Sequence, residues 1–374
     1  MALWAMKWLG ITVLLVFASL SPIVSAEEVY EETDHLSQYS KAVQLAFARC
    51  AELPAHDGTW LVVSSHPMGK NAPLLPNAWL VQASPVEIDA WLASNRIEIA
   101  CPELERQHEP RWTPNDPKFS DQWHLQNTGQ TSGLVGEDAN LTGAWQSYQG
   151  TDVMIGIVDD GLDHEHPDLT TNYDTSNDYD FCGNDGNPSP SNWDAHGTAA
   201  AGVAAATGNN SVGVSGAAPD ANLIGLELIS CNTPDSKEAD ALSHENQIID
   251  IYSNSWGPSD DGSTLEAPGP LTMAAFEDDV ANGRGGLGNI ITWAAGNGLD
   301  SDDDSNKDGY ANARQTIAVT AITHQGDQSW YAEPGANILV AAHSDGDGEG
   351  ITTTDIEGSS GYTNNDYTND FGGT

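Results

Sequence analysis

The sequence from residue 151 onward alternates between short apolar segments and segments with helical periodicity. The run 153–158 is apolar throughout, which is typical of a strand buried on both faces of a parallel sheet. Further strands are expected at 222–229, 248–253, 289–294 and 316–321, with helices at 196–206, 236–247 and 268–282. This order predicts an α/β fold with a mainly parallel sheet, whose functional sites lie at the carboxyl ends of its strands.

Residues 27–111 have a different pattern and predict a small α+β domain. We expect strands at 59–64, 77–83 and 96–100, and a helix at 41–53 that Pro54 ends. A capping box, Ser84 with Glu87, predicts a second helix that extends to Ser94. This block holds six of the twelve basic residues, so a domain boundary is expected before residue 112.

The first 26 residues have the features of a secretory signal peptide. Lys7 precedes an apolar stretch that extends to about Leu20, and small residues follow at Val24-Ser25-Ala26. An uncleaved anchor is the alternative, but the apolar stretch is short for a membrane span. We therefore expect a secreted protein, extracellular or periplasmic, with no membrane attachment after signal cleavage.

The four cysteines fall into two sets along the chain, Cys50 with Cys101 and Cys182 with Cys231. Export permits disulfide bonds. Pairing within each set is the expectation, although four cysteines allow three connectivities.

Acidic residues dominate the charge of the chain. Its 374 residues include 55 Asp and Glu against 12 Lys and Arg, so the formal net charge is −43. A surface that negative repels phosphate, which excludes a nucleic-acid-binding protein. So many carboxylates are typical of a secreted protein that stays hydrated in salty surroundings. Some of these carboxylates are also candidates for binding cations.

Three polar motifs follow or open the predicted elements at one edge of the sheet. Asp159-Asp160-Gly161 directly follows the strand 153–158, and Asp194-Ala-His196 leads into the helix 196–206. Asn297 follows the strand 289–294. A carboxylate that orients an imidazole, with an amide placed for an oxyanion, is the apparatus of acyl transfer by a nucleophilic serine.

With these motifs the sequence resembles the subtilisin-like serine proteases, and among them the kexin- and furin-like proprotein convertases. The runs that carry the resemblance are Asn115-Asp-Pro-Lys-Phe, Asp121-Gln-Trp-His-Leu, Ile157-Val-Asp-Asp-Gly, His166-Pro-Asp-Leu, His196-Gly-Thr, Tyr252-Ser-Asn-Ser-Trp-Gly-Pro, Gly283-Arg-Gly-Gly-Leu-Gly, Trp293-Ala-Ala-Gly-Asn-Gly and Trp330-Tyr-Ala-Glu. The resemblance implies a three-layer subtilisin-like catalytic domain at residues 112–374. It also implies Asp159 as the triad acid, His196 as the general base and Asn297 as the oxyanion-hole donor.

The family places its nucleophilic serine directly after a Gly-Thr pair, and this chain ends at Phe371-Gly-Gly-Thr374. We therefore expect the catalytic domain to be cut one residue before that serine. A catalytically inactive, secreted Ca²⁺-binding homologue is the alternative. Ser359 and Ser360 are poor substitutes, because they lie in a Gly-rich polar stretch with no helix after it.

The resemblance also implies acidic substrate subsites that bind basic side chains. The matching positions are Asp260 and Asp308 for P1, Asp160 for P2, and Glu238 and Glu266 for P4. Glu266 replaces the usual Asp, and Trp193 occupies a place near P2 where an acid is common. Protein or peptide substrates with a basic P1 residue are expected, and a broad-specificity subtilase is the alternative.

Three groups of oxygen ligands match calcium sites of the family, and Ca²⁺ prefers such ligands. The first group is Asp116, Asp168, Gly208, Asn210, Val212 and Val214. The second is Asp260, Asp303 and Glu333, and the third is Asp180, Asp185 and Asn187. Ca²⁺ is therefore the expected cofactor, and zinc is not indicated because the histidines lack ligand spacing.

We expect residues 27–111, a compact block before the protease, to be an intramolecular propeptide that the enzyme itself releases by a cut after Arg111. A permanently attached accessory domain is the alternative. The stretch Arg106-Gln-His-Glu-Pro-Arg111 is polar and contains proline, as exposed and cleavable junctions do. Arg111 supplies a basic P1 residue, whereas Pro110 at P2 and His108 at P4 are not the basic residues that acidic subsites favour.

Overall fold

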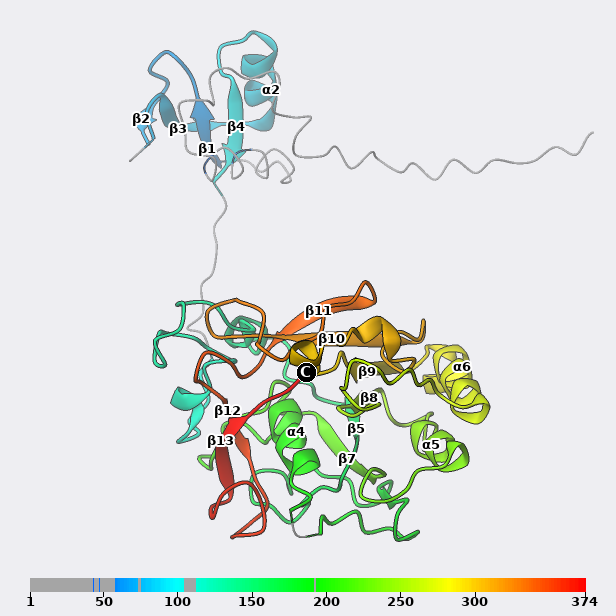
Figure 1. The fold of residues 1–374 in the computed structure, drawn as a ribbon. Coiled ribbons are helices and arrows are strands. Elements are labelled where there is room, and N and C mark those ends of the chain that lie inside the picture. Colours follow the sequence, from blue (N-terminus) through cyan, green and yellow to red (C-terminus); the bar gives the residue numbers. More distant parts are fainter. Residues whose placement is uncertain (1–42, 44–46, 48–57, 73–74, 104–111, 192) are drawn as a thin grey trace, which may run out of the picture. The chain divides into compact units, whose positions relative to one another are not determined.

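The computed structural model describes residues 43, 47, 58–72, 75–103, 112–191 and 193–374. The chain divides into two compact units, Met1–Glu109 and Pro110–Thr374 (Figure 1). Among the described residues, no helix combines the length and the apolar composition that a bilayer span requires. The predicted signal peptide and Cys50 lie outside the described residues, as does most of the helix predicted at 41–53.

The first unit is a four-stranded antiparallel sheet with one helix, as expected of an α+β domain. Its strands are β1 (Gly58–Val63), β2 (Lys70–Asn71), β3 (Ala78–Ala83) and β4 (Ile99–Pro102), in the order β2-β3-β1-β4. The helix α2 (Pro85–Ala93) begins with the predicted capping box of Ser84 and Glu87. The strand predicted at 96–100 begins late, because the N–H groups of Arg96 and Ile97 still bond to the Trp91 carbonyl at the end of α2.

The second unit contains a seven-stranded sheet whose neighbouring strands are all parallel. In spatial order its strands are β11 (Ile338–His343), β10 (Thr316–Ile322), β9 (Ile290–Ala294), β8 (Ile251–Asn254), β5 (Met154–Asp159), β7 (Asn222–Glu227) and β6 (Tyr179–Asp180). The predicted mainly parallel α/β fold is confirmed. The sequence pattern missed β6 and β11, which are short or largely exposed edge strands.

Helices and a separate hairpin complete the second unit. The helices are α3 (Leu141–Ala144), α4 (His196–Ala205), α5 (Asp235–Leu242) and α6 (Pro270–Gly286), and the short 3₁₀ helices are η3 (Phe119–Asp121), η4 (Leu299–Ser301) and η5 (Ser305–Lys307). Strands β12 (Ile351–Thr354) and β13 (Tyr367–Phe371) pair antiparallel beside α4, and α5 packs on α6 (Figure 1). The helix predicted at 236–247 ends early at Leu242, because residues 243–250 turn before β8 begins.

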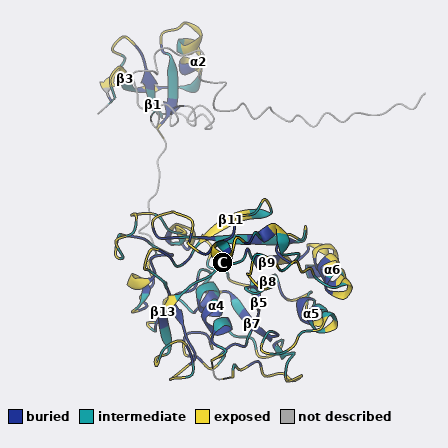
Figure 2. Cartoon of the chain, viewed as in Figure 1, coloured by how far each residue is buried: buried dark blue, intermediate teal, exposed yellow. Residues whose placement is uncertain are grey.

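The core has one apolar layer on each face of the sheet. Figure 2 shows buried and exposed residues alternating along α5 and α6, as in helices that cover a core with one side. Alternate residues of β5 point to opposite faces: Ile155 and Ile157 pack with Ala201 of α4, whereas Val158 packs with Phe276 of α6. Helix, sheet and helix therefore form the three layers of the predicted fold. The small residues of α4 are required by β12, because Thr353 and Thr354 would collide with a Cβ on Gly202.

Candidate active site

The carboxyl end of β5 and the first turn of α4 bring Asp159 and His196 together. His196 Nδ1 lies 2.9 Å from both carboxylate oxygens of Asp159, and Asp159 is buried. Gly197 permits this close approach, because a Cβ there would lie 2.9 Å from the Asp159 Cβ. His196 Nε2 makes no hydrogen bond to a described residue, so it is available to a group that enters the site.

Asp160 fixes the start of the helix that carries His196. Its Oδ2 accepts from the His196 N–H at 3.1 Å, and its Oδ1 accepts from the Gly197 N–H at 2.7 Å. These are the first two N–H groups of α4, which have no partner within the helix. Burial raises the pKa of Asp160 to about 6, and the charge of Asp159 adds to this shift.

His196 is subject to opposing effects. Burial lowers its pKa, whereas the carboxylates of Asp159 and Asp160 raise it, and the result is a pKa of about 9. The favoured state beside two carboxylates is therefore the imidazolium, with Nδ1–H directed at Asp159. That hydrogen bond fixes which nitrogen faces the open side of the site.

Asn297 follows β9 on the turn 295–298, and the last residues of the chain lie against it. Gly296 allows the turn because its φ is +109°. Asn297 Oδ1 accepts from the Thr374 N–H at 3.0 Å and from its hydroxyl at 3.2 Å. The Phe371 ring lies 5.3 Å from the His196 ring, so residues 371–374 extend from His196 to Asn297. A cavity of about 250 Å³ is lined by His196, Ser253, Phe371 and Thr374, among others.

Four of the predicted acidic residues line one cavity next to Asn297. They are Asp260, Asp303, Asp308 and Glu333. Burial raises the pKa of Asp308 to about 6 and that of Glu333 to about 7, and neighbouring carboxylates add to both shifts. Lys307 Nζ, 3.3 Å from Asp303 Oδ1, is the cation that the described residues supply here. The cavity has a volume of about 10 Å³, so its charge favours a cation and its size suits a single ion rather than a long side chain.

Glu238 and Glu266 lie together in a second cavity of about 340 Å³. Glu238 is buried and accepts a hydrogen bond from the Tyr310 hydroxyl at 2.8 Å. Glu266 is exposed, and its backbone pairs with Asp308 in an isolated bridge. Asp160 lines neither of these cavities, and its two oxygens accept hydrogen bonds at the start of α4.

The first predicted calcium group converges on two buried carboxylates. Asp116 accepts from the Asn209 and Asn210 N–H groups, and Asp168 accepts from the Val214 N–H and the Asn210 Nδ2 at 2.7 Å. Gly208 and Val212 belong to the same loop, 207–214. No Lys or Arg in the described parts of the chain pairs with Asp116 or Asp168, and burial raises the pKa of Asp168. Buried carboxylates without a counter-charge fit a cation.

The second group, Asp260, Asp303 and Glu333, converges on Gly298. A Cβ on Gly298 would lie 2.7 Å from the Asp303 Cβ, 2.8 Å from Glu333 Oε1 and 3.0 Å from the Asp260 Cβ. Burial raises the pKa of Asp260 as well as that of Glu333. Three carboxylates against one ammonium group also fit a cation.

The third group lies on one turn, where Asp180 and Asp185 pair through two backbone hydrogen bonds. Asp185 accepts from the Asn187 N–H at 3.0 Å, and Asn187 Oδ1 accepts from the Ser189 hydroxyl at 2.8 Å. The carboxylate of Asp180 also groups with Glu227 and with the disulfide sulfur of Cys182, with these atoms within 4.8 Å of one another. Sequence reasoning missed Glu227, whose pKa burial and Asp180 raise to about 7. Its only signal was its position at the carboxyl end of β7, beside Asp159.

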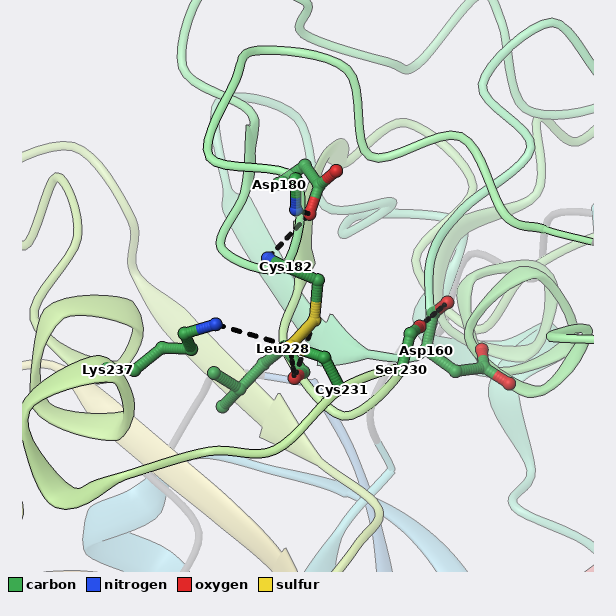
Figure 3. The surroundings of a disulfide bond; sticks show 8 residues. Asp160, Asp180, Cys182, Leu228, Ser230, Cys231 and Lys237 are labelled. Carbon is green, nitrogen blue, oxygen red and sulfur yellow. Dashed lines mark hydrogen bonds between the residues drawn. A yellow bond between two sulfur atoms is a disulfide. The ribbon is translucent and has the colours of Figure 1, made fainter.

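One predicted disulfide lies at the same edge of the sheet. Cys182 and Cys231 are bonded, which ties the loop after β6 to the loop after β7 (Figure 3). Lys237 Nζ lies 3.3 Å from Cys231 Sγ, and the Ser230 hydroxyl donates to the Asp160 carbonyl at 2.6 Å. The bond therefore anchors both loops next to Asp160. The other predicted pair involves Cys50, outside the described residues.

Comparisons with known proteins agree with this geometry. The subtilase family (Peptidase S8) matches residues 150–374. The chain is 42% identical over 254 residues to neuroendocrine convertase 2 of Homo sapiens and 44% identical over 255 residues to that of Rattus norvegicus, and each match covers 65% of this chain and 40% of the relative. The crystal structure of the serine protease of Aeromonas sobria is similar with a TM-score of 0.62 and 25% identity, covering 72% of this chain and 55% of that one.

The family match covers more than half of the chain and includes Asp159, His196 and Asn297. The chain spans about 40% of the length of the curated relatives that it matches. The buried parallel sheet, the pairing of Asp159 with His196 at its edge and the family match lead to one conclusion: this chain belongs to the subtilase family.

Proposed function

We propose that the full-length protein is a secreted, calcium-dependent serine endopeptidase that cleaves after Arg or Lys. The observation that carries the proposal is the position of the last residues of the chain. They extend from the His196 ring to the Asn297 amide, so a residue after Thr374 would begin between a base and an oxyanion donor. A serine at that position would complete the apparatus for acyl transfer.

In the proposed mechanism, His196 Nε2 takes the proton of the serine hydroxyl as the hydroxyl attacks the scissile carbonyl. Asp159 holds Nδ1–H at 2.9 Å, which keeps the imidazole in the required tautomer and stabilises the imidazolium. The Asn297 Nδ2 amide donates to the oxyanion of the tetrahedral intermediate. His196 then returns the proton to the leaving amine.

The acidic residues beside Asn297 support the proposed specificity for a basic P1 residue, which would lie against them at the surface of their small cavity. Asp308 and Asp260 would accept hydrogen bonds from a guanidinium or ammonium group, which relieves the cost of burying their charges. Glu238 and Glu266 form a second acidic cavity suited to a basic P4 residue. A substrate with an apolar P1 side chain would leave Asp260 and Asp308 without that positive charge.

Calcium would bind to two clusters of carboxylates, in which Lys307 beside Asp303 is the one protein counter-charge that the described residues supply. Asp116 and Asp168, with the loop 207–214, would hold one ion, and Asp260, Asp303 and Glu333 would hold another. A bound Ca²⁺ supplies positive charge that keeps the clustered carboxylates ionised and in place. The Asn297 N–H donates to Asp260 at 3.0 Å. A Ca²⁺ ion that holds Asp260 in place would therefore also hold Asn297 in place in the proposed oxyanion hole.

The test begins with the codon that follows Thr374, and then compares the full-length protein with a variant that has alanine at that position. Peptides identical except for Arg, Lys or Ala at P1 serve as substrates. We expect the serine form to cleave the Arg and Lys peptides with a kcat/KM roughly 10³-fold or more above the Ala peptide, because the buried acids reject a side chain that leaves them unpaired. Equal cleavage of the Ala peptide would indicate a broad-specificity subtilase. A codon other than serine, with no cleavage, would indicate an inactive homologue.

A further inference from the structure

The backbone of Gly373 is held by three side chains that the proposed mechanism does not use. Its N–H donates to the Tyr331 hydroxyl oxygen at 3.1 Å and to Asp345 Oδ1 at 3.2 Å. Its carbonyl accepts from the Ser344 hydroxyl at 2.7 Å. Both polar groups of Gly373 are therefore bonded to side chains from outside the segment 371–374. We call Tyr331, Ser344 and Asp345 the Gly373 clamp.

The clamp is itself anchored to the sheet. Ser344 and Asp345 directly follow β11, and the Ser344 N–H donates to the Ile322 carbonyl at the end of β10. The Tyr331 hydroxyl donates to Asp345 Oδ1, and the Ser329 hydroxyl donates to the Asp345 carbonyl at 2.7 Å. Burial raises the pKa of Tyr331 to about 12, and the hydrogen bond to Asp345 adds to this shift, so the hydroxyl stays protonated and donates. A buried network whose members are all bonded has one defined arrangement.

Thr374 connects the clamp to the proposed oxyanion donor. The N–H and the hydroxyl of Thr374 both donate to Asn297 Oδ1, and Asn297 Nδ2 makes no hydrogen bond to a described residue. The Gly296 N–H donates to Thr374 Oγ1 at 3.0 Å. Because a donor must face Oδ1, these contacts fix which atom of the Asn297 amide is left for a ligand. The position of Thr374 in turn depends on Gly373, to which it is joined by one peptide bond.

We propose that Tyr331, Ser344 and Asp345 are positioning residues, which hold Gly373 so that the nucleophile after Thr374 and the Asn297 amide reach the same substrate carbonyl. Acyl transfer needs both groups in a fixed geometry, and a displacement of about 1 Å can lower the rate about 10²-fold. Both groups act in the transition state, so the clamp should govern kcat rather than substrate binding. The proposal rests on the serine endopeptidase proposed above.

The experiment measures kcat and KM of the full-length protein on the peptide with Arg at P1, and hydrogen exchange in the segment 371–374. Tyr331→Phe removes the hydroxyl and keeps the ring. We expect kcat to fall roughly 10- to 100-fold, KM to stay within about twofold of the wild-type value, and exchange to become faster. Ser344→Ala should have the same effects from the carbonyl side of Gly373. The double variant should lose less than the product of the two single losses, because both side chains hold one residue.

Two further variants separate positioning from general stability. Asp345→Asn keeps an oxygen that accepts from Tyr331 and Gly373, so it should retain more of kcat than Asp345→Ala. Tyr173→Phe is the matched control, because the Tyr173 hydroxyl donates to the Asp178 carboxylate at 2.9 Å in a tyrosine–aspartate pair outside the clamp. It should change neither kcat nor the exchange of the segment 371–374.

The possible outcomes distinguish the clamp from the proposed function. An unchanged kcat in Tyr331→Phe and in Ser344→Ala, with Arg still required at P1, would overturn the clamp alone. An equal loss of kcat in Tyr173→Phe would overturn it too, because the effect would then be one of stability. A loss confined to the clamp variants, with equal cleavage of the Arg and Ala peptides, would overturn the proposed specificity alone. If no peptide is cleaved, exchange decides, and equal rates in Tyr331→Phe and Tyr173→Phe overturn the clamp.

Discussion

The protonation of His196 depends on the residues that surround it. Burial lowers its pKa, but Asp159 and Asp160 raise the pKa to about 9, well above the usual value of 6.5. A general base must be neutral to accept a proton, so the rate should increase as the pH rises through the folded-state pKa. Asp160, which also holds the start of α4, therefore influences the pH at which the site becomes active.

Asp160→Asn should lower the pKa of His196, because it removes one of the two negative charges beside the imidazole. We expect the acidic limb of the kcat/KM profile to move to lower pH by about one unit. The measurement is a pH–rate profile of the full-length protein on the peptide with Arg at P1. Asp152→Asn, a charge loss at an exposed turn, is the control. An unchanged acidic limb would exclude this role of Asp160.

His124 presents the opposite case, a histidine buried without a partner. Neither ring nitrogen has a hydrogen-bond partner among the described residues. Burial lowers its pKa to about 3, and His343, which lies 3.3 Å from Glu137, adds to the shift. The unfolded chain therefore takes up a proton before the folded one does. The free energy of unfolding should fall as the pH decreases from about 6.5 toward about 3, by about 1.4 kcal/mol per pH unit.

His124→Phe should remove this pH dependence, because phenylalanine occupies a similar volume and does not titrate. Between pH 6.5 and pH 4.5, we expect the free energy of unfolding to fall by about 2 kcal/mol less in the variant than in the wild type. Urea unfolding at several pH values measures the difference. His66→Phe, at an exposed histidine, should follow the wild-type curve. Parallel curves for His124→Phe and the wild type would contradict the assignment.

Strands position the proposed catalytic residues, whereas loops bring together the carboxylates proposed to bind Ca²⁺. β5 delivers Asp159 to the edge of the sheet, and β9 delivers the turn with Asn297. The carboxylates proposed to bind Ca²⁺ lie in loops, outside the helices and strands. Their mutual repulsion opposes the folded loops unless a cation is bound.

Removal of Ca²⁺ should therefore destabilise the second unit. A ligand that binds only the folded state at one hundred times its Kd adds about 2.7 kcal/mol per site. We expect the melting temperature to fall in excess EDTA and to recover when Ca²⁺ is added back. Asp168→Asn should reduce the response to EDTA, because it removes a carboxylate of the first group, whereas Asp347→Asn, at an exposed position, should retain it. A melting temperature that EDTA does not change would refute calcium binding.

At the scale of the whole molecule, the chain consists of two units that divide between Glu109 and Pro110. Each unit has its own sheet and its own apolar core. The first unit is therefore able to fold as a separate domain and to be released by one cut. Arg111 lies two residues after the division, at the position where a basic-specific protease would cut.

We predict that the full-length protein removes residues 27–111 by cleavage after Arg111. The forms with serine and with alanine after Thr374 should differ in their first residue: Trp112 for the serine form and a residue at or near Glu27 for the alanine form. N-terminal sequencing of both products decides. A serine form that still begins near Glu27 would refute the cleavage. If both forms begin at Trp112, another protease makes the cut.

Features that depend on neighbours along the chain were predictable from the local sequence. The apolar run of β5, the capping box of α2 and the small residues of α4 are local patterns, and each predicted its element. The family motifs likewise follow from short runs of residues. Boundaries were less certain, as at α5, because a turn and the end of a helix have similar local sequences.

Tertiary structure decided the features that join distant segments. The Asp180 carboxylate lies next to Glu227 of another strand, and the last residues of the chain meet Asn297, 77 positions away from Thr374. The strained backbone of Trp193 depends on a hydrogen bond to Ser360. Local patterns report propensity and burial, whereas these contacts arise only when the sheet brings its loops to one edge, which is why only the fold could show them.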